Sequence, residues 1–229
     1  MSMTHNRKHR VSPTLIGFTG PSGSGKSTLS ALAQEILQSA ELIHGDVFMF
    51  ASAMAHQNEF EEIFGVPLDI NDPVACLAHA LDICSMKSRK YLYCIADFIE
   101  EQFNAEISRV MTDSIVAPQY IILDWIGLSF LNLWKLCEHR IVVDAPLELI
   151  EKRLQGRDSF YTAGCGAIRY EAVREILRKA AQDAYQVYNG SNNHGIKKIR
   201  AFCAYLNHSE LSQTVLPDSN ILKQLVKTV

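Results

Sequence analysis

The 229-residue sequence contains no run of the roughly 18 to 20 apolar residues that a bilayer-spanning helix needs. The apolar segment that follows the basic stretch HNRKHR is soon broken by glycines, so it is too short for the core of a signal peptide. The six cysteines form no C-x-x-C pair, which favours reduced thiols over a zinc site or a disulfide framework. We therefore expect a cytoplasmic protein without a membrane partner.

The sequence also lacks a surplus of positive charge. Lys and Arg number 22 against 25 Asp and Glu, which gives a formal net charge of −3. Because nucleic-acid binding relies on a basic surface, nucleic acid is not an expected partner. There is no internal repeat or low-complexity segment, and 48% of the residues are hydrophobic. The length suits one α/β domain with a sizeable core, or one domain that carries an inserted subdomain, and we expect a flexible tail at residues 1–12.

One motif carries a specific chemistry. Residues Gly20–Ser27 read GPSGSGKS, a complete G-x-x-x-x-G-K-[ST] pattern between an expected strand at 14–18 and an expected helix from Lys26. Glycines allow successive amides to point at phosphates, and the lysine reaches the β- and γ-phosphates. We therefore expect ATP and Mg²⁺ as cofactors. The residues expected to contact the nucleotide are Gly20, Ser22, Gly23, Ser24, Gly25, Lys26, Ser27, Thr28 and Arg153, with Lys26 also catalytic.

Strand and helix patterns alternate along the chain. Further strands are expected at 41–46, 120–125, 140–145 and 212–216, which implies a five-stranded parallel sheet with helices on both faces. Residues 47–118 show helical patterns only and predict a helical insertion. Helices are also expected from Pro146, around 173–181, at 196–206 and at 218–229.

Three of the expected strands end in an aspartate. Ligands of an open parallel sheet gather at the carboxyl ends of its strands, so these carboxylates should face the phosphate-binding loop. Asp46 is the catalytic candidate, because a carboxylate there can accept the proton of an attacking hydroxyl. Asp124 is the better candidate for a Mg²⁺ ligand through water, together with Ser27, whereas Asp144 suits a structural turn equally well.

A polar, glycine-punctuated segment follows the helix expected from Pro146. It begins near Arg153 and Arg157, and we expect residues 156–208 to contain a lid and its helices. Arginines on a closing lid stabilise the charge of a transferring phosphoryl group. Arg157 is therefore a catalytic candidate.

The motifs together resemble the dephospho-CoA kinase family of P-loop kinases over most of the chain. The similarity lies in TGPSGSGKST, in HGD where the family has DAD, in EIFG (residues 62–65) and most closely in RIVVDAPLELIEKRLQGRD. The resemblance implies a P-loop kinase domain at 13–229, with an acceptor-binding insertion at 47–118. It also implies an adenine contact at either NGSNNHG (189–195) or VLPDSN (215–220), of which the second has the better position between strand and helix.

The departures from the family gather on the acceptor side. His44 replaces the first aspartate of DAD, Phe50 stands where an arginine is expected, and Asp97 with Phe98 replaces a His-Pro pair. Three functions remain. The first is phosphorylation of the ribose 3′-hydroxyl of dephospho-CoA, and the second is phosphorylation of another small acceptor such as a nucleoside. The third is nucleotide binding by a catalytically inactive paralogue. The oligomeric state cannot be read from the sequence.

Overall fold

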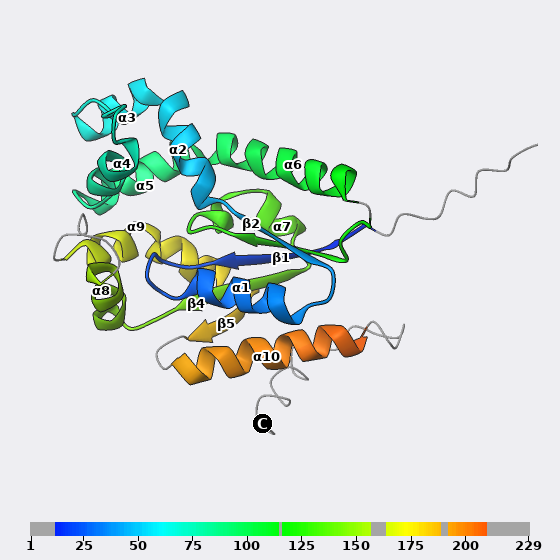
Figure 1. The fold of residues 1–229 in the computed structure, drawn as a ribbon. Helices are drawn as coiled ribbons and strands as arrows, with labels where there is room; N and C mark the ends of the chain where they lie inside the picture. Colours follow the sequence, from blue (N-terminus) through cyan, green and yellow to red (C-terminus); the bar gives the residue numbers. More distant parts are fainter. Residues whose placement is uncertain (1–11, 115, 157–163, 189–191, 210–229) are drawn as a thin grey trace, which may run out of the picture.

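The computed structural model describes residues 12–114, 116–156, 164–188 and 192–209. They form a parallel sheet with helices against both faces (Figure 1). The predicted α/β fold with five parallel strands is confirmed. The strands, in the spatial order β2-β3-β1-β4-β5, are β1 (Thr14–Thr19), β2 (Ala40–His44), β3 (Tyr120–Asp124), β4 (His139–Asp144) and β5 (Tyr185–Tyr188).

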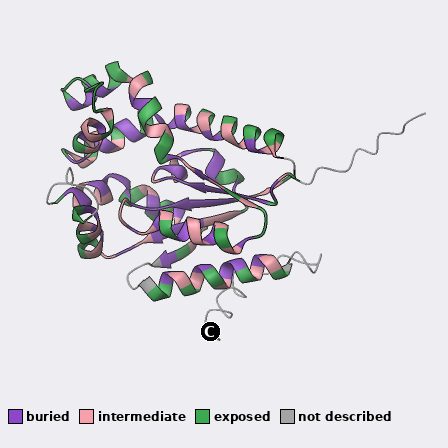
Figure 2. Cartoon of the chain, viewed as in Figure 1, coloured by how far each residue is buried: buried purple, intermediate pink, exposed green. Residues whose placement is uncertain are grey.

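The two faces of the sheet bury different helices. Ile122 of β3 belongs to an apolar cluster with residues of α1 (Lys26–Ile36) and α10 (Asn192–Ser209), whereas its neighbours Ile121 and Leu123 belong to the cluster of the opposite face. Because successive strand residues point to opposite faces, a strand covered on both sides must be apolar throughout. All residues of β3 are buried, and the outward faces of α6 and α10 are exposed (Figure 2).

A helical insertion separates β2 from β3; its first helices lie toward the carboxyl edge of the sheet, and its last helix runs back over one face (Figure 1). The start of the fourth helix, α4, is set by a local cap. Asp72 accepts a hydrogen bond from the amide of Ala75 at 3.1 Å. The helices of the insertion are α2 (Asp46–Ala55), α3 (Gln57–Phe64), α4 (Pro73–Leu81), α5 (Ser85–Cys94) and α6 (Ala96–Asp113).

The remaining described elements connect the strands. After β3 the chain forms a 3₁₀ turn, η1 (Leu128–Phe130), and the short helix α7 (Leu133–Leu136). After β4 it forms α8 (Leu147–Gln155) and α9 (Cys165–Ala180), and α9 packs against α5 of the insertion. Across the described ranges, every helix is too short or too polar to serve as a membrane span. All six cysteines are free thiols.

The position of the fifth strand corrects the sequence interpretation. We expected it at 212–216, which lies outside the described residues, as does the helix expected at 218–229. The strand that pairs with β4 is Tyr185–Tyr188, and α10 begins at Asn192, inside the segment read as a loop. Four residues are too few to show a clear period of two, so the pattern gave no signal. The segment between the last described strand and helix is therefore part of NGSNNHG.

The end of the second strand also differs from the expectation. β2 ends at His44, and Asp46 is the first residue of α2. The amide of Gly45 donates to the carbonyl of Asp124 at 2.8 Å, which keeps the chain beside β3 for one more residue before it turns into the helix. Asp46 therefore lies in the first turn of α2 rather than at the end of a strand. At this position its carboxylate also interacts favourably with the helix dipole.

Candidate active site

The phosphate-binding loop joins the carboxyl end of β1 to the first turn of α1. Gly23 and Gly25 have φ angles of +79° and +94°, in the left-handed region that strongly favours glycine. A loop with such conformations turns successive backbone N–H groups toward one concavity, and the N-terminal end of α1 adds its partial positive charge. The loop is therefore shaped to hold an anion such as a phosphate.

Lys26 is held in place by a buried carboxylate. Its Nζ lies 2.8 Å from Oδ1 of Asp124, the last residue of β3, which is 1% exposed. The other oxygen, Oδ2, accepts a hydrogen bond from Ser30 Oγ at 3.1 Å and lies 3.1 Å from Nδ1 of His44. Burial by itself would raise the pKa of Asp124, but the charge of Lys26 and the hydrogen bond from His44 hold it well below its usual range. Asp124 is therefore an anion that fixes the ammonium group beside the loop.

A cavity of about 760 Å³ lies at the carboxyl edge of the sheet. One side, which we call the nucleotide half, is the loop with parts of α1, α8 and α10. The other side, the acceptor half, is formed by Asp46 and by residues of α2, α4, α5 and α9. The two halves open into each other, so a nucleotide phosphate and a second molecule can meet inside one cavity.

Most of the predicted nucleotide contacts line this cavity, namely Ser22, Gly23, Gly25, Lys26, Ser27, Thr28 and Arg153. Gly20 and Ser24 are buried residues of the loop and do not line the cavity. Arg153 of α8 donates from Nη1 to the carbonyl of Gly23 at 2.9 Å, so it braces the loop. Arg157 lies outside the described residues, and its role in a lid stays a prediction.

The three strand-end carboxylates have different surroundings. Asp46 lines the cavity and is exposed to solvent. Asp124 is buried beneath Lys26. Asp144 accepts hydrogen bonds from the amide of Ala145 at 2.8 Å and from the hydroxyl of Tyr170 at 3.3 Å, and it holds the turn into α8. Of the three, Asp46 is the carboxylate that a bound acceptor can contact.

Ser27 and Asp124 fit a Mg²⁺ ion of a particular kind. Both oxygens of Asp124 are engaged by Lys26, Ser30 and His44, so this carboxylate suits contact through water rather than direct coordination. The described residues contain no cluster of three acidic, histidine or cysteine side chains that would hold a metal by itself. These residues would suit an ion held mainly by the phosphates of a bound nucleotide, by water and by the Ser27 hydroxyl.

The sequence interpretation missed one charged residue of the cavity. Arg169 of α9 lines the acceptor half and is largely buried. Its Nε donates a hydrogen bond to Asp82, and its Nη2 donates one to the carbonyl of Ala78 at 2.8 Å. One signal was available, because Arg169 precedes Val173 by four residues and so shares the buried stripe of its helix. The pair ties α9 to the end of α4.

We expect the Asp82–Arg169 pair to be important for stability. Asp82→Asn leaves the charge of a buried guanidinium uncompensated, so the free energy of unfolding should fall by about 3–5 kcal/mol in urea titrations. The exposed pair Glu171–Arg174, at 3.2 Å, provides the control, and Glu171→Gln should cost less than about 1 kcal/mol. Equal effects of the two substitutions would contradict this assignment.

His44 gives the site a pH-dependent contribution to stability. The hydrogen bond to Asp124 raises the pKa of His44, although partial burial and the nearby Lys26 act in the opposite direction. A histidine whose pKa is higher in the folded state stabilises the fold fully below its unfolded pKa of about 6.5, and loses this contribution as the pH rises through the folded pKa.

The corresponding experiment compares the wild type with His44→Asn. The wild type should be more stable below pH 6.5, and the difference in unfolding free energy should shrink as the pH is raised toward pH 8. Other titrating groups are common to both proteins and largely cancel. A difference that is independent of pH, or that grows with pH, would show that His44 is not protonated against Asp124.

The strand order, the phosphate-binding loop after β1 and the helical insertion after β2 together define a P-loop kinase fold. A crystal structure of TT1252 from Thermus thermophilus has the same fold, with a TM-score of 0.60 and 20% identity over 86% of this chain and 98% of that one. No protein-family model matches the sequence.

A relative with a known name shows to which family of P-loop kinases the chain belongs. The dephospho-CoA kinase of Treponema denticola is 30% identical over 155 residues, which cover 64% of this chain and 68% of the relative. The chain belongs to the dephospho-CoA kinase family.

Proposed function

We propose that the protein is an ATP-dependent kinase that phosphorylates the ribose 3′-hydroxyl of dephospho-CoA to form CoA. The observation that carries the proposal is the shared cavity, in which Asp46 of the insertion faces the same space as Lys26 and the phosphate-binding loop. Membership of the dephospho-CoA kinase family supports the general chemistry, a phosphoryl transfer to an alcohol.

The geometry suggests a division of roles in the transfer. Loop amides and Lys26 bind the phosphates of ATP and stabilise the charge that develops on them. Asp46 orients the acceptor hydroxyl and accepts its proton as the oxygen bonds to the γ-phosphorus. The bond between that phosphorus and the bridging oxygen of ADP breaks, and ADP leaves with the electron pair.

The supporting groups act on these residues. Asp124 keeps Lys26 oriented, and Arg153 holds the loop through the carbonyl of Gly23. A Mg²⁺ ion held by the phosphates and Ser27 would neutralise charge on the β- and γ-phosphates. Arg157 would add positive charge from the lid.

A second acceptor class is favoured by a specific observation. The acceptor half is lined largely by apolar side chains, and Phe50 is one of them. Such a surface accommodates a nucleoside as readily as the adenosine end of dephospho-CoA. A nucleoside kinase is therefore the alternative.

The test is a competition between acceptors in one assay. With Mg-ATP, we expect dephospho-CoA to give faster ADP release than an equimolar panel of nucleosides, and the product to have the mass of CoA. Faster turnover of a nucleoside would establish the alternative. Tight ATP binding without release of ADP for any acceptor would indicate the inactive paralogue and overturn both kinase proposals.

A further inference from the structure

The acceptor half of the cavity differs sharply in chemistry from the nucleotide half. Its walls are apolar over most of their extent, with side chains from four helices. Those that define the wall are Met49, Phe50, Val74, Leu77, Leu92 and Ala172. Removing such a surface from water is favourable only when the partner is also apolar or flat and uncharged.

The charges around this half offer no net attraction for an anion. Arg169 is the cation among the described residues of this wall, and its guanidinium is already paired with the carboxylate of Asp82. Asp46 adds a negative charge at the boundary with the nucleotide half. An ionised phosphate buried here would have to lose water without gaining an uncompensated cation, which costs several kcal/mol.

The Ser88 hydroxyl of the wall already donates its hydrogen bond within the protein. The Ser88 hydroxyl lies 2.6 Å from the carbonyl of Leu81 and 2.9 Å from that of Cys84, so its single proton is directed into the backbone. What Ser88 presents to a ligand is therefore the lone pairs of its oxygen. A donor such as a ring N–H suits this position, and an anion does not.

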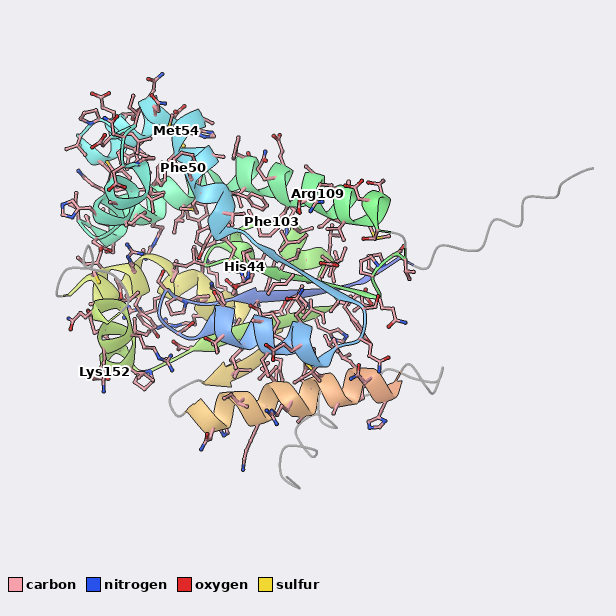
Figure 3. All side chains as sticks on the ribbon, viewed as in Figure 1. His44, Phe50, Met54, Phe103, Arg109 and Lys152 are labelled. Carbon is pink, nitrogen blue, oxygen red and sulfur yellow. The ribbon has the colours of Figure 1, made fainter. Side chains whose placement is uncertain are left out.

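Phe50 supplies a surface for a ring. It follows Asp46 by four residues on α2, so the two residues lie on the same side of the helix. Phe50 lines the cavity and keeps 44% of its surface exposed. Figure 3 marks its place on α2. A large aromatic side chain left exposed beside a reactive carboxylate lies within reach of the body of a molecule whose hydroxyl is at Asp46. Aromatic rings bind other rings by offset or edge-to-face stacking.

We propose that the acceptor half binds an uncharged ring system of the acceptor, stacked on Phe50, and that the ionised groups of the acceptor stay outside the cavity. The inference rests on the proposed function, because it places the reacting hydroxyl at Asp46. For dephospho-CoA, the base of the adenosine end is the buried part and the pyrophosphate lies at the mouth.

The experiment measures by calorimetry how tightly two probes bind to the full chain. The protein is first saturated with Mg-AMP-PNP, so that the nucleotide half is filled and no turnover occurs. Adenosine is the uncharged ring probe, and 4′-phosphopantetheine is the anionic probe without a ring. We expect adenosine to bind and 4′-phosphopantetheine to bind much more weakly.

Substitutions of Phe50 decide whether the ring stacks there. Phe50→Leu should weaken adenosine binding about ten-fold, as expected for the loss of one stacked base. Phe50→Ala should weaken it at least as much, because neither a ring nor a large apolar side chain remains at this position. Val47→Ala is the matched control, because Val47 is 65% exposed on the same helix and does not line the cavity. Adenosine affinity should be unchanged in that variant, and AMP-PNP affinity should be unchanged in all three.

Three results would overturn the inference. They are tighter binding of 4′-phosphopantetheine than of adenosine, adenosine binding that is insensitive to Phe50, and no binding of adenosine to the loaded protein. These results are separable from a failure of the proposed function. A protein that transfers no phosphoryl group to dephospho-CoA and still binds adenosine through Phe50 would lose its proposed substrate and keep the inferred class of acceptor.

Discussion

Lys26→Ala is expected to lower kcat about a thousand-fold, the loss found when a single preorganised group that stabilises transition-state charge is removed. Lys26 is the cation at the base of the phosphate-binding loop, and its Nζ is fixed by Asp124 at 2.8 Å. Because this ion pair orients the ammonium group, the charge is preorganised toward the loop. The measurement is steady-state ADP release with saturating Mg-ATP and acceptor.

The same substitution should also destabilise the fold. It leaves the carboxylate of Asp124 buried without its cation, and breaking a buried pair in this way costs about 3–5 kcal/mol. The double variant Lys26→Ala with Asp124→Asn separates the two effects. It should recover much of the stability and none of the activity. A near-normal kcat in Lys26→Ala would contradict a catalytic role for the lysine of the phosphate-binding loop.

Asp46→Asn is the second substitution with a large expected effect. A positioned general base contributes about 10²- to 10⁴-fold to the rate, so kcat should fall by this factor. Affinity for ATP should be unchanged, because Asp46 lies in the acceptor half of the cavity. Stability should change little, since the side chain is exposed on the first turn of α2.

The control for Asp46 is Glu59→Gln. Glu59 is an exposed acidic residue in the first turn of α3, so this variant loses the same favourable interaction with a helix dipole without touching the cavity. It should retain wild-type turnover. Equal activity of Asp46→Asn and the wild type would show that the hydroxyl is activated elsewhere.

The parts of the site that the sequence revealed are those encoded by neighbouring residues. The loop, β1 and α1 form one continuous stretch, so the glycine spacing and the helical period identify them together. Asp46 and Asp124 could be placed at one edge because the carboxyl ends of parallel strands coincide. β5 escaped detection because four residues are too short for a periodic signal.

The parts that the sequence did not reveal depend on contacts between distant residues. Asp82 and Arg169 are 87 positions apart, and no local pattern couples them. The bond from His44 to Asp124 likewise spans 80 positions. Among the aromatic residues, Trp125 and Phe103 are buried in the core, whereas Phe50 lines the cavity. Composition alone could not separate these roles, because large apolar side chains suit both.

ATP and an acceptor hydroxyl should meet at Lys26 and Asp46, where the two halves of one cavity join. The most direct test follows the label from [γ-³²P]ATP into dephospho-CoA or a nucleoside, with the wild type and Asp46→Asn side by side. We predict labelled acceptor with the wild type, and almost none with the variant although it binds ATP normally. Equal labelling by both proteins, or tight ATP binding by the wild type with no labelled acceptor, would contradict the claim.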